Sequence, residues 1–93
     1  MNERMQTPTI PAFFAVIPVK VLRDKRLQPV EKLLYAEITS MLDARGYCHT
    51  SYEEFAQLYD CSSRTIARYV KSLKECGYVT VDDRGIYAGR RMF

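Results

Sequence analysis

The sequence has no tryptophan, one histidine and no glycine-rich phosphate loop among its 93 residues. His49, the single histidine, has no convincing nucleophile or carboxylate partner in the sequence. Acid–base and nucleophilic catalysis need such partnered groups, and nucleotide chemistry needs a cradle for phosphate. These absences predict a protein that is not an enzyme and that uses no cofactor.

Cysteine is also scarce, and its pattern excludes two common uses. Cys48, Cys61 and Cys76 make an odd count without a C-x-x-C pair, which argues against both a disulfide framework and a zinc ribbon. Together with His49 they could form a metal set, but their spacing matches no familiar zinc pattern. We therefore expect reduced thiols, buried in the core, and no metal.

No apolar run approaches the roughly 18 residues that a membrane span requires. Residues 12–17 are apolar but too few, and Pro18 follows them. The first residues are polar and interrupted by proline, unlike a signal peptide. We therefore predict a cytoplasmic protein without membrane contact, with a flexible arm over residues 1–12 and a single domain over residues 13–93.

What is present is the composition of a globular domain, 47% hydrophobic and 27% charged. The net charge of +3 is unevenly distributed along the chain. Residues 1–29 carry +3, residues 30–63 carry −4, and residues 64–93 carry +4. This asymmetry indicates one surface that faces a polyanion and another that is acidic.

Hydrophobic periodicity and capping residues predict the elements. A short helix is expected over residues 18–24, after an apolar segment at residues 13–17. A long helix is expected over residues 29–45, with Leu34, Ile38, Met41 and Leu42 as its apolar stripe, widened by Leu33, Tyr35 and Ala36. The S-x-x-E pattern of Ser51 and Glu54 predicts a capping box that opens a helix ending at Asp60. Its expected buried face consists of Phe55, Ala56, Leu58 and Tyr59.

Ser62 is a natural N-cap for a further helix that Gly77 ends, with an apolar stripe of Ile66, Tyr69, Val70 and Leu73. Short strands are expected over residues 47–50, 78–81 and 86–88, the last two joined by a turn at residues 82–85. The predicted fold class is mostly α with a small β-hairpin, in the order of a winged helix-turn-helix.

Four positions in residues 52–70 meet the requirements of a helix-turn-helix together. Ala56 is the small residue where the second helix packs closely, and Asp60 occupies the turn position that tolerates left-handed dihedrals. Cys61 is the apolar residue just after the turn, and Ile66 follows it five places later. This combination predicts that the helix after Ser62 is a recognition helix.

The recognition helix places cations on the side opposite its apolar stripe. Arg64, Arg68 and Lys71 step by four and three residues, with no acid among them. Arginine can donate to guanine edges, and all three cations can neutralise phosphates; the alternative is an ordinary solvated face. Small donors at the helix N-terminus could meet a phosphate, and Ala67 permits close approach to a thymine methyl. The expected DNA-binding residues here are Ser62, Ser63, Arg64, Thr65, Ala67, Arg68 and Lys71.

The hairpin would form the wing, with Arg84 at its tip and Arg90 and Arg91 beyond the returning strand. Wings commonly touch the DNA backbone or minor groove, where arginine is favoured, so these three complete the expected DNA-binding set. A second cationic cluster near the start is interpreted as a solvated connector rather than a contact surface; it comprises Lys20, Arg23, Lys25 and Arg26.

Two stretches resemble the amino-terminal winged helix of phage and plasmid replication-initiation proteins, the DnaD-like replisome organisers and RepA-type initiators. They are FFAVIPVKVLRDKRLQPVEKLLYAEI and SYEEFAQLYDCSSRTIARYVKSLKECGYVTV, and the resemblance spans residues 13–88. It implies binding to origin double-stranded DNA and frequent self-association. In that family a separate carboxy-terminal domain recruits replisome proteins. The resemblance therefore implies such partners only through a domain that these 93 residues do not include, and both a fragment of a longer initiator and a small stand-alone regulator stay open.

Three functions remain open at this level. The same contacts could serve replication initiation or, at an operator, transcriptional regulation, because a fold does not determine its function. A winged helix can also act as a protein-interaction module. The apolar segment at residues 13–17 motivates a possible homodimer, since a chain of this length has a small core in which to bury it.

Overall fold

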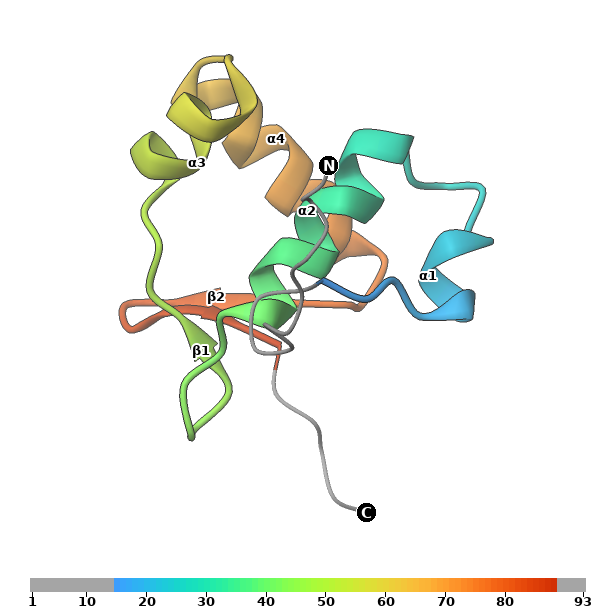
Figure 1. The fold of residues 1–93 in the computed structure, drawn as a ribbon, viewed down its shortest axis with the longest axis horizontal. Coiled ribbons are helices and arrows are strands. Elements are labelled where there is room, and N and C mark those ends of the chain that lie inside the picture. The colour runs from blue at the N-terminus through green and yellow to red at the C-terminus, as the bar shows by residue number, and fades with distance from the viewer. Residues whose placement is uncertain (1–14, 89–93) are drawn as a thin grey trace, which may run out of the picture.

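The computed structural model describes residues 15–88, and its elements follow the predicted order (Figure 1). The predicted arm at residues 1–12, and Arg90 and Arg91, lie outside the described residues. The helices are α1 (Val19–Leu22), α2 (Pro29–Ser40), α3 (Tyr52–Tyr59) and α4 (Ser63–Glu75). The strands are β1 (Tyr47–Cys48), β2 (Thr80–Asp82) and β3 (Gly85–Tyr87).

The predicted hairpin is part of a larger sheet. β2 and β3 pair antiparallel, and β1 pairs antiparallel with the other edge of β3, which gives the order β1-β3-β2. Cys48 lies opposite Ile86, and Val81 lies opposite Ile86 on the other side. In Figure 1 this sheet lies below α3 and α4, with the turn between β2 and β3 at the left. The β-like segment after α2 is thereby joined to the wing.

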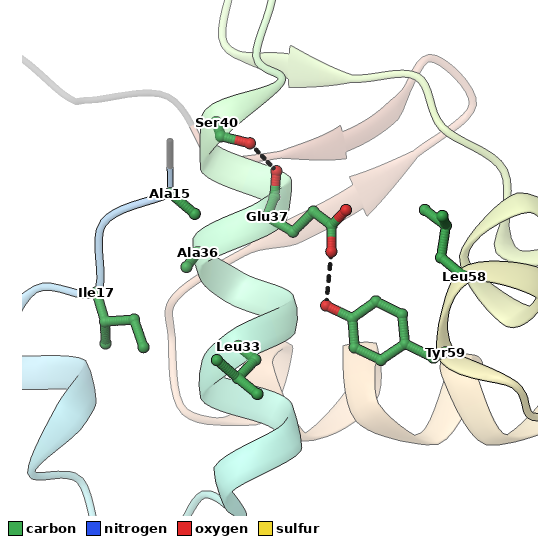
Figure 2. A pocket seen from close by; sticks show the side chains of 8 residues that line it. All are labelled: Ala15, Ile17, Leu33, Ala36, Glu37, Ser40, Leu58 and Tyr59. Carbon is green, nitrogen blue, oxygen red and sulfur yellow. Dashed lines mark hydrogen bonds between the residues drawn. The ribbon is translucent and has the colours of Figure 1, made fainter. Parts of the chain in front are cut away.

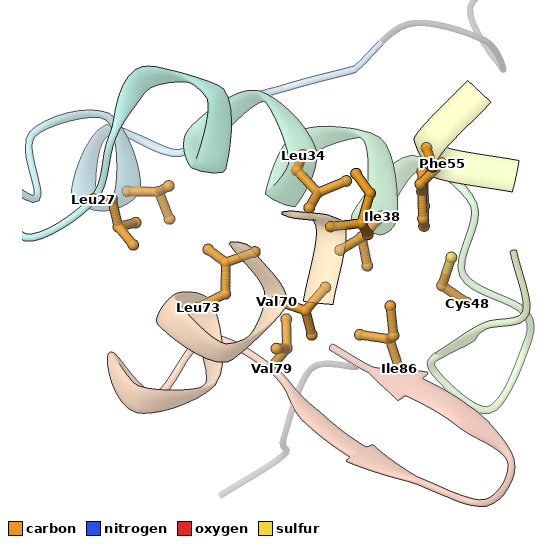
Figure 3. Packing of buried hydrophobic residues seen from close by; sticks show 12 residues of the cluster. Leu27, Leu34, Ile38, Cys48, Phe55, Val70, Leu73, Val79 and Ile86 are labelled. Carbon is orange, nitrogen blue, oxygen red and sulfur yellow. The ribbon is translucent and has the colours of Figure 1, made fainter. Parts of the chain in front are cut away.

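One core holds the helices against the sheet (Figure 3). α2 contributes Leu34 and Ile38, and α3 contributes Phe55, all without exposed surface. The expected stripe of α4 is confirmed for Ile66, Val70 and Leu73, which are buried, while Tyr69 is half-buried. Cys48, Val79 and Ile86 cover this cluster from the sheet side. Burial of this apolar surface is what fixes the direction of α4.

The cysteines fit the core only in part. All three are free thiols; Cys48 is fully buried, but Cys61 and Cys76 are half-buried at the edge of the core. Within residues 15–88 no group of three histidine, cysteine or acidic side chains is placed to hold a metal ion. No helix in this part of the chain is long and apolar enough to cross a membrane.

The helix predicted over residues 29–45 ends five residues early, at Ser40. The hydroxyls of Thr39 and Ser40 donate to carbonyls of the preceding turn, which competes with continuation of the helix. Asp43 then accepts hydrogen bonds from the N–H groups of Arg45 and Tyr47. This Asp43 turn folds the chain back into β1 instead of extending α2.

Two leucines expected in buried faces are exposed. Leu33 on α2 retains 55% of its accessible surface and Leu58 on α3 retains 65%. Leu33 lies about 100° around α2 from Leu34, and Leu58 lies about 60° around α3 from Phe55 and about 160° from Ala56, so the packing of Leu34, Phe55 and Ala56 turns both leucines outward. Met41 is also exposed, at 38%, because it follows the end of α2.

Leu33 and Leu58 border a shallow apolar groove between α2 and α3 (Figure 2). Across it the hydroxyl of Tyr59 donates to Glu37 at 2.8 Å, which ties the two helices together. Burial of the Tyr59 ring and this hydrogen bond both raise the pKa of the phenol. The apolar segment at the start of the described chain reaches the same groove, through Ala15 and Ile17.

Candidate nucleic-acid interface

The turn between α3 and α4 has the geometry that the sequence predicted. Asp60 adopts the left-handed conformation, with φ 55° and ψ 50°. The N–H of Cys61 donates to the carbonyl of Ala56 at 3.0 Å, and Ala56 itself is buried at the helix contact. Ser62 then caps α4 by accepting from the N–H of Thr65 at 3.1 Å. The short turn therefore sets α4 at a defined angle to α3.

The exposed face of α4 carries a basic ridge, which we define as Arg64, Arg68 and Lys71. All three side chains are exposed, whereas Ile66, Val70 and Leu73 on the opposite side are buried. Within the described chain, none of the three cations makes a hydrogen bond or an ion pair, and Arg68 lies 6.0 Å from the centre of the Tyr69 ring. The ridge thus presents three uncompensated charges, and the only acid of α4, Glu75, lies at the helix end.

The small residues predicted beside the ridge are placed at the start of α4. Ser62 is exposed, but its hydroxyl oxygen already accepts from Thr65 and lies 3.1 Å from the Thr65 hydroxyl. Ser63, Thr65 and Ala67 are half-buried. The Ser62 hydroxyl therefore serves mainly as a helix cap, while Ser63 and Ala67 border the ridge with little bulk.

The wing is the hairpin of β2 and β3, and its turn comprises Asp82–Gly85, as predicted. Arg84 is exposed at this turn, and its guanidinium lies 5.2 Å from the centre of the Tyr47 ring on β1. The Tyr47 hydroxyl donates to Asp82 at 2.6 Å, which raises the pKa of the phenol and lowers that of the carboxyl. Side chains of β1 and of the turn therefore hold the tip of the wing against β1.

His49 is exposed at the end of β1, as expected, but the expectation that it has no carboxylate partner is wrong. Its Nε2 lies 2.7 Å from Asp43 Oδ2, and its Nδ1 lies 3.0 Å from the carbonyl oxygen of Arg84. The hydrogen bond to Asp43 raises the pKa of His49. Sequence reasoning missed this pair because it placed Asp43 inside a helix, whereas Asp43 lies in the loop that leads into β1.

The four residues of the amino-terminal cationic cluster differ in their contacts. Arg26 pairs with Asp24 at 2.7 Å, and Tyr78, which follows α4, donates to the same carboxylate at 2.8 Å. The hydrogen bonds from Arg26 hold the pKa of Asp24 well below its usual range. Arg26 thus helps to fasten the loop after α1, while Lys20, Arg23 and Lys25 are exposed.

Helices α2, α3 and α4 with a three-stranded antiparallel sheet, formed by β1 after α2 and by the hairpin after α4, and a tight turn before an exposed basic helix define a winged helix. The comparison with known families agrees: residues 25–79 match the family described as a helix-turn-helix domain, and the chain belongs to this family. No curated protein and no solved structure matches the chain significantly.

Proposed function

We propose that this protein is a binding protein for double-stranded DNA rather than an enzyme, with α4 lying in the major groove. The basic ridge carries this proposal, because three exposed cations, which have no ion-pair partner among residues 15–88, face away from the core on the helix that follows the turn. Such charges release counterions from phosphates, and arginine can also donate to guanine. Membership of the helix-turn-helix family supports the same function.

The residues that we propose to contact DNA fall into two groups. The ridge and its small neighbours form the first: Ser63, Arg64, Thr65, Ala67, Arg68 and Lys71, with Ser62 as the cap that orders them. The wing forms the second, through Arg84 and, beyond the described residues, Arg90 and Arg91. We further propose origin DNA of a phage or plasmid as the target, on the basis of the resemblance of residues 13–88 to replication initiators.

The test is binding to a pool of random-sequence duplexes across a salt series. Replacing both arginines (Arg64→Ala/Arg68→Ala) should weaken binding on the order of 100-fold at low salt and flatten the salt dependence by about two phosphate contacts. A matched control, Lys20→Ala/Lys25→Ala, removes the same charge away from α4 and should lose far less affinity. Equal losses in the two variants would contradict the assignment of α4, and absence of binding by the natural chain at low salt would reject the function.

Sequencing the duplexes that the natural chain retains would test the finer assignment. Enrichment of a short site that is bound in directly repeated copies would agree with an origin, whereas enrichment of a single palindromic site would favour the operator of a regulator. Either result leaves the role of the basic ridge unchanged, since both functions use the same contacts.

A further inference from the structure

His49 lies between two hydrogen-bond acceptors that come from distant parts of the chain. Asp43 Oδ2, in the loop between α2 and β1, is 2.7 Å from Nε2, and the carbonyl oxygen of Arg84, in the wing turn, is 3.0 Å from Nδ1. A neutral imidazole can donate from one nitrogen only, whereas the imidazolium donates from both. Because a carboxylate and a carbonyl both require a donor, the arrangement is that of a protonated ring.

We propose that protonated His49 is a positioning residue for the wing: it fastens the Arg84 turn to the Asp43 loop, and loss of its proton releases the turn and weakens DNA binding. The part of this proposal that concerns affinity rests on the proposed DNA-binding function. The part that concerns the turn does not.

The groups around the ring favour its charged form. Asp43 is the nearest anion, and its other oxygen accepts from the N–H groups of Arg45 and Tyr47 at 2.8 and 3.0 Å. These hydrogen bonds and the one from His49 lower the pKa of Asp43 to about 2, so it stays ionised. The Tyr47 ring stacks beside the imidazole of His49, with ring centres 6.3 Å apart. The Arg84 guanidinium lies over the Tyr47 ring. The pKa of His49 is correspondingly raised.

The wing turn depends on side chains because its backbone pairing with β1 ends before the turn. The ladder between β1 and β3 stops at the pair of Cys48 with Ile86. Within the hairpin, Asp82 pairs with Gly85 and accepts from the N–H of Arg84 at 2.8 Å. Beyond the ladder with β1, the contacts between the turn and β1 or its end are the Tyr47–Asp82 hydrogen bond, the Arg84 guanidinium over the Tyr47 ring, and the hydrogen bond of His49 to the Arg84 carbonyl. When the ring loses a proton, the Asp43 carboxylate retains the remaining N–H, and a lone pair then faces the Arg84 carbonyl. That contact changes from attraction to repulsion.

The first experiment follows the wing directly, without DNA. Backbone amide resonances of Arg84 and Gly85 and the ring of His49 are recorded from about pH 5.5 to about pH 8. We expect the wing amides to titrate with the same midpoint as the ring, above the ordinary histidine value. In Asp43→Asn both midpoints should move down together, and in His49→Gln the transition should vanish. Wing amides that stay constant while the ring titrates would overturn the proposal.

The second experiment measures affinity for a duplex at the two ends of that pH range. The natural chain should bind about fivefold more weakly at the higher pH, the effect expected for one lost hydrogen bond that orients a contact residue. His49→Gln should bind equally at both. Arg45→Gln, which removes a nearby exposed charge but leaves the ring, should keep the pH dependence and bind at the lower pH nearly as tightly as the natural chain. A loss of about fivefold in Arg45→Gln at the lower pH would mean that loss of one charge in this region explains the effect, and would overturn the positioning role.

The outcomes are distinguishable. An affinity that does not change with pH, although the wing amides titrate, would overturn the link between the wing and DNA. The same pH dependence in His49→Gln as in the natural chain would also overturn it. Failure to bind DNA at either pH would reject the proposed function, while the amide titration would still decide whether His49 holds the turn.

Discussion

Two glycines with left-handed backbone, Gly77 and Gly85, differ in what surrounds them. A Cβ on Gly85, whose φ is 138°, would lie 2.5 Å from the carbonyl oxygen of Cys48, so no side chain fits where β3 passes β1. Gly77, whose φ is 85°, has open space within 4 Å. At Gly77 an alanine would strain only the backbone, whereas at Gly85 it would also push apart two strands.

We therefore predict unequal losses of stability. Gly85→Ala should lower the free energy of unfolding by roughly 3 kcal/mol, and Gly77→Ala by about 1–2 kcal/mol, the cost of a left-handed non-glycine residue. Urea denaturation followed by circular dichroism measures both. Equal losses would mean that the sheet relaxes around the new methyl group.

The side chain of Asp24 links the loop after α1 to the segment after α4, through Arg26 and Tyr78, and its ionisation has a predictable effect. Its pKa is lower in the folded chain than the ordinary value of 3.8, mainly through the hydrogen bonds from Arg26. The stability it contributes is therefore present above pH 4 and is lost as the pH falls through the folded pKa.

Replacing this group should make the chain less sensitive to acid. Asp24→Asn should be less stable than the natural chain at about pH 7, and the difference should shrink as the pH falls below about 4 towards the lowered pKa of Asp24 in the folded chain. Urea midpoints at several pH values give the comparison. A constant difference across this range would mean that the contribution of Asp24 does not come from its charge.

Among the elements, α3 is a helix of eight residues that packs on the core through one face only. Phe55 is fully buried between α2 and the sheet, whereas Leu58 on the same helix is 65% exposed. Phe55→Ala should cost about 3–5 kcal/mol of stability, since it opens a cavity in the core. Leu58→Ala should change stability by less than about 0.5 kcal/mol. Thermal unfolding of the two variants tests which of the two residues is buried. A large loss of stability for Leu58→Ala would mean that Leu58 is buried in solution, with the groove between α2 and α3 covered.

Most elements could be predicted from sequence because their signals are local. The Ser51 box, the Ser62 cap and the left-handed Asp60 depend on residues within one turn, and the structure confirms each of them. The end of α2, the exposure of Leu58 and the partner of His49 depend on contacts across the fold, which periodicity does not contain. The basic ridge could be predicted because an apolar stripe that faces the core leaves the residues on the opposite side of the helix exposed.

For the whole molecule, the important connection is between α4 and the wing. The N–H of Tyr78 donates to the carbonyl of Leu73 at 2.9 Å, and Val79 enters the core immediately afterwards. The chain therefore leaves α4 and enters β2 without a loose linker. Because β1 holds the opposite edge of β3, one frame carries both the basic ridge and the base of the wing. The Arg84 turn extends from this frame, so the proposed release at His49 would alter the spacing between two proposed contact regions.

The pairing of β1 with β3 also has a consequence for the order of events during synthesis. Cys48 has its strand partner at Ile86, so β1 leaves the ribosome long before the segment that completes its hydrogen bonds. Helices α2, α3 and α4 can meet first, through local contacts that form quickly. The sheet must close last, when residue 87 has emerged from the exit tunnel. We therefore expect the emerging chain to form α4 before it has a wing, so that the nascent protein holds the basic ridge without the strands that later complete the sheet.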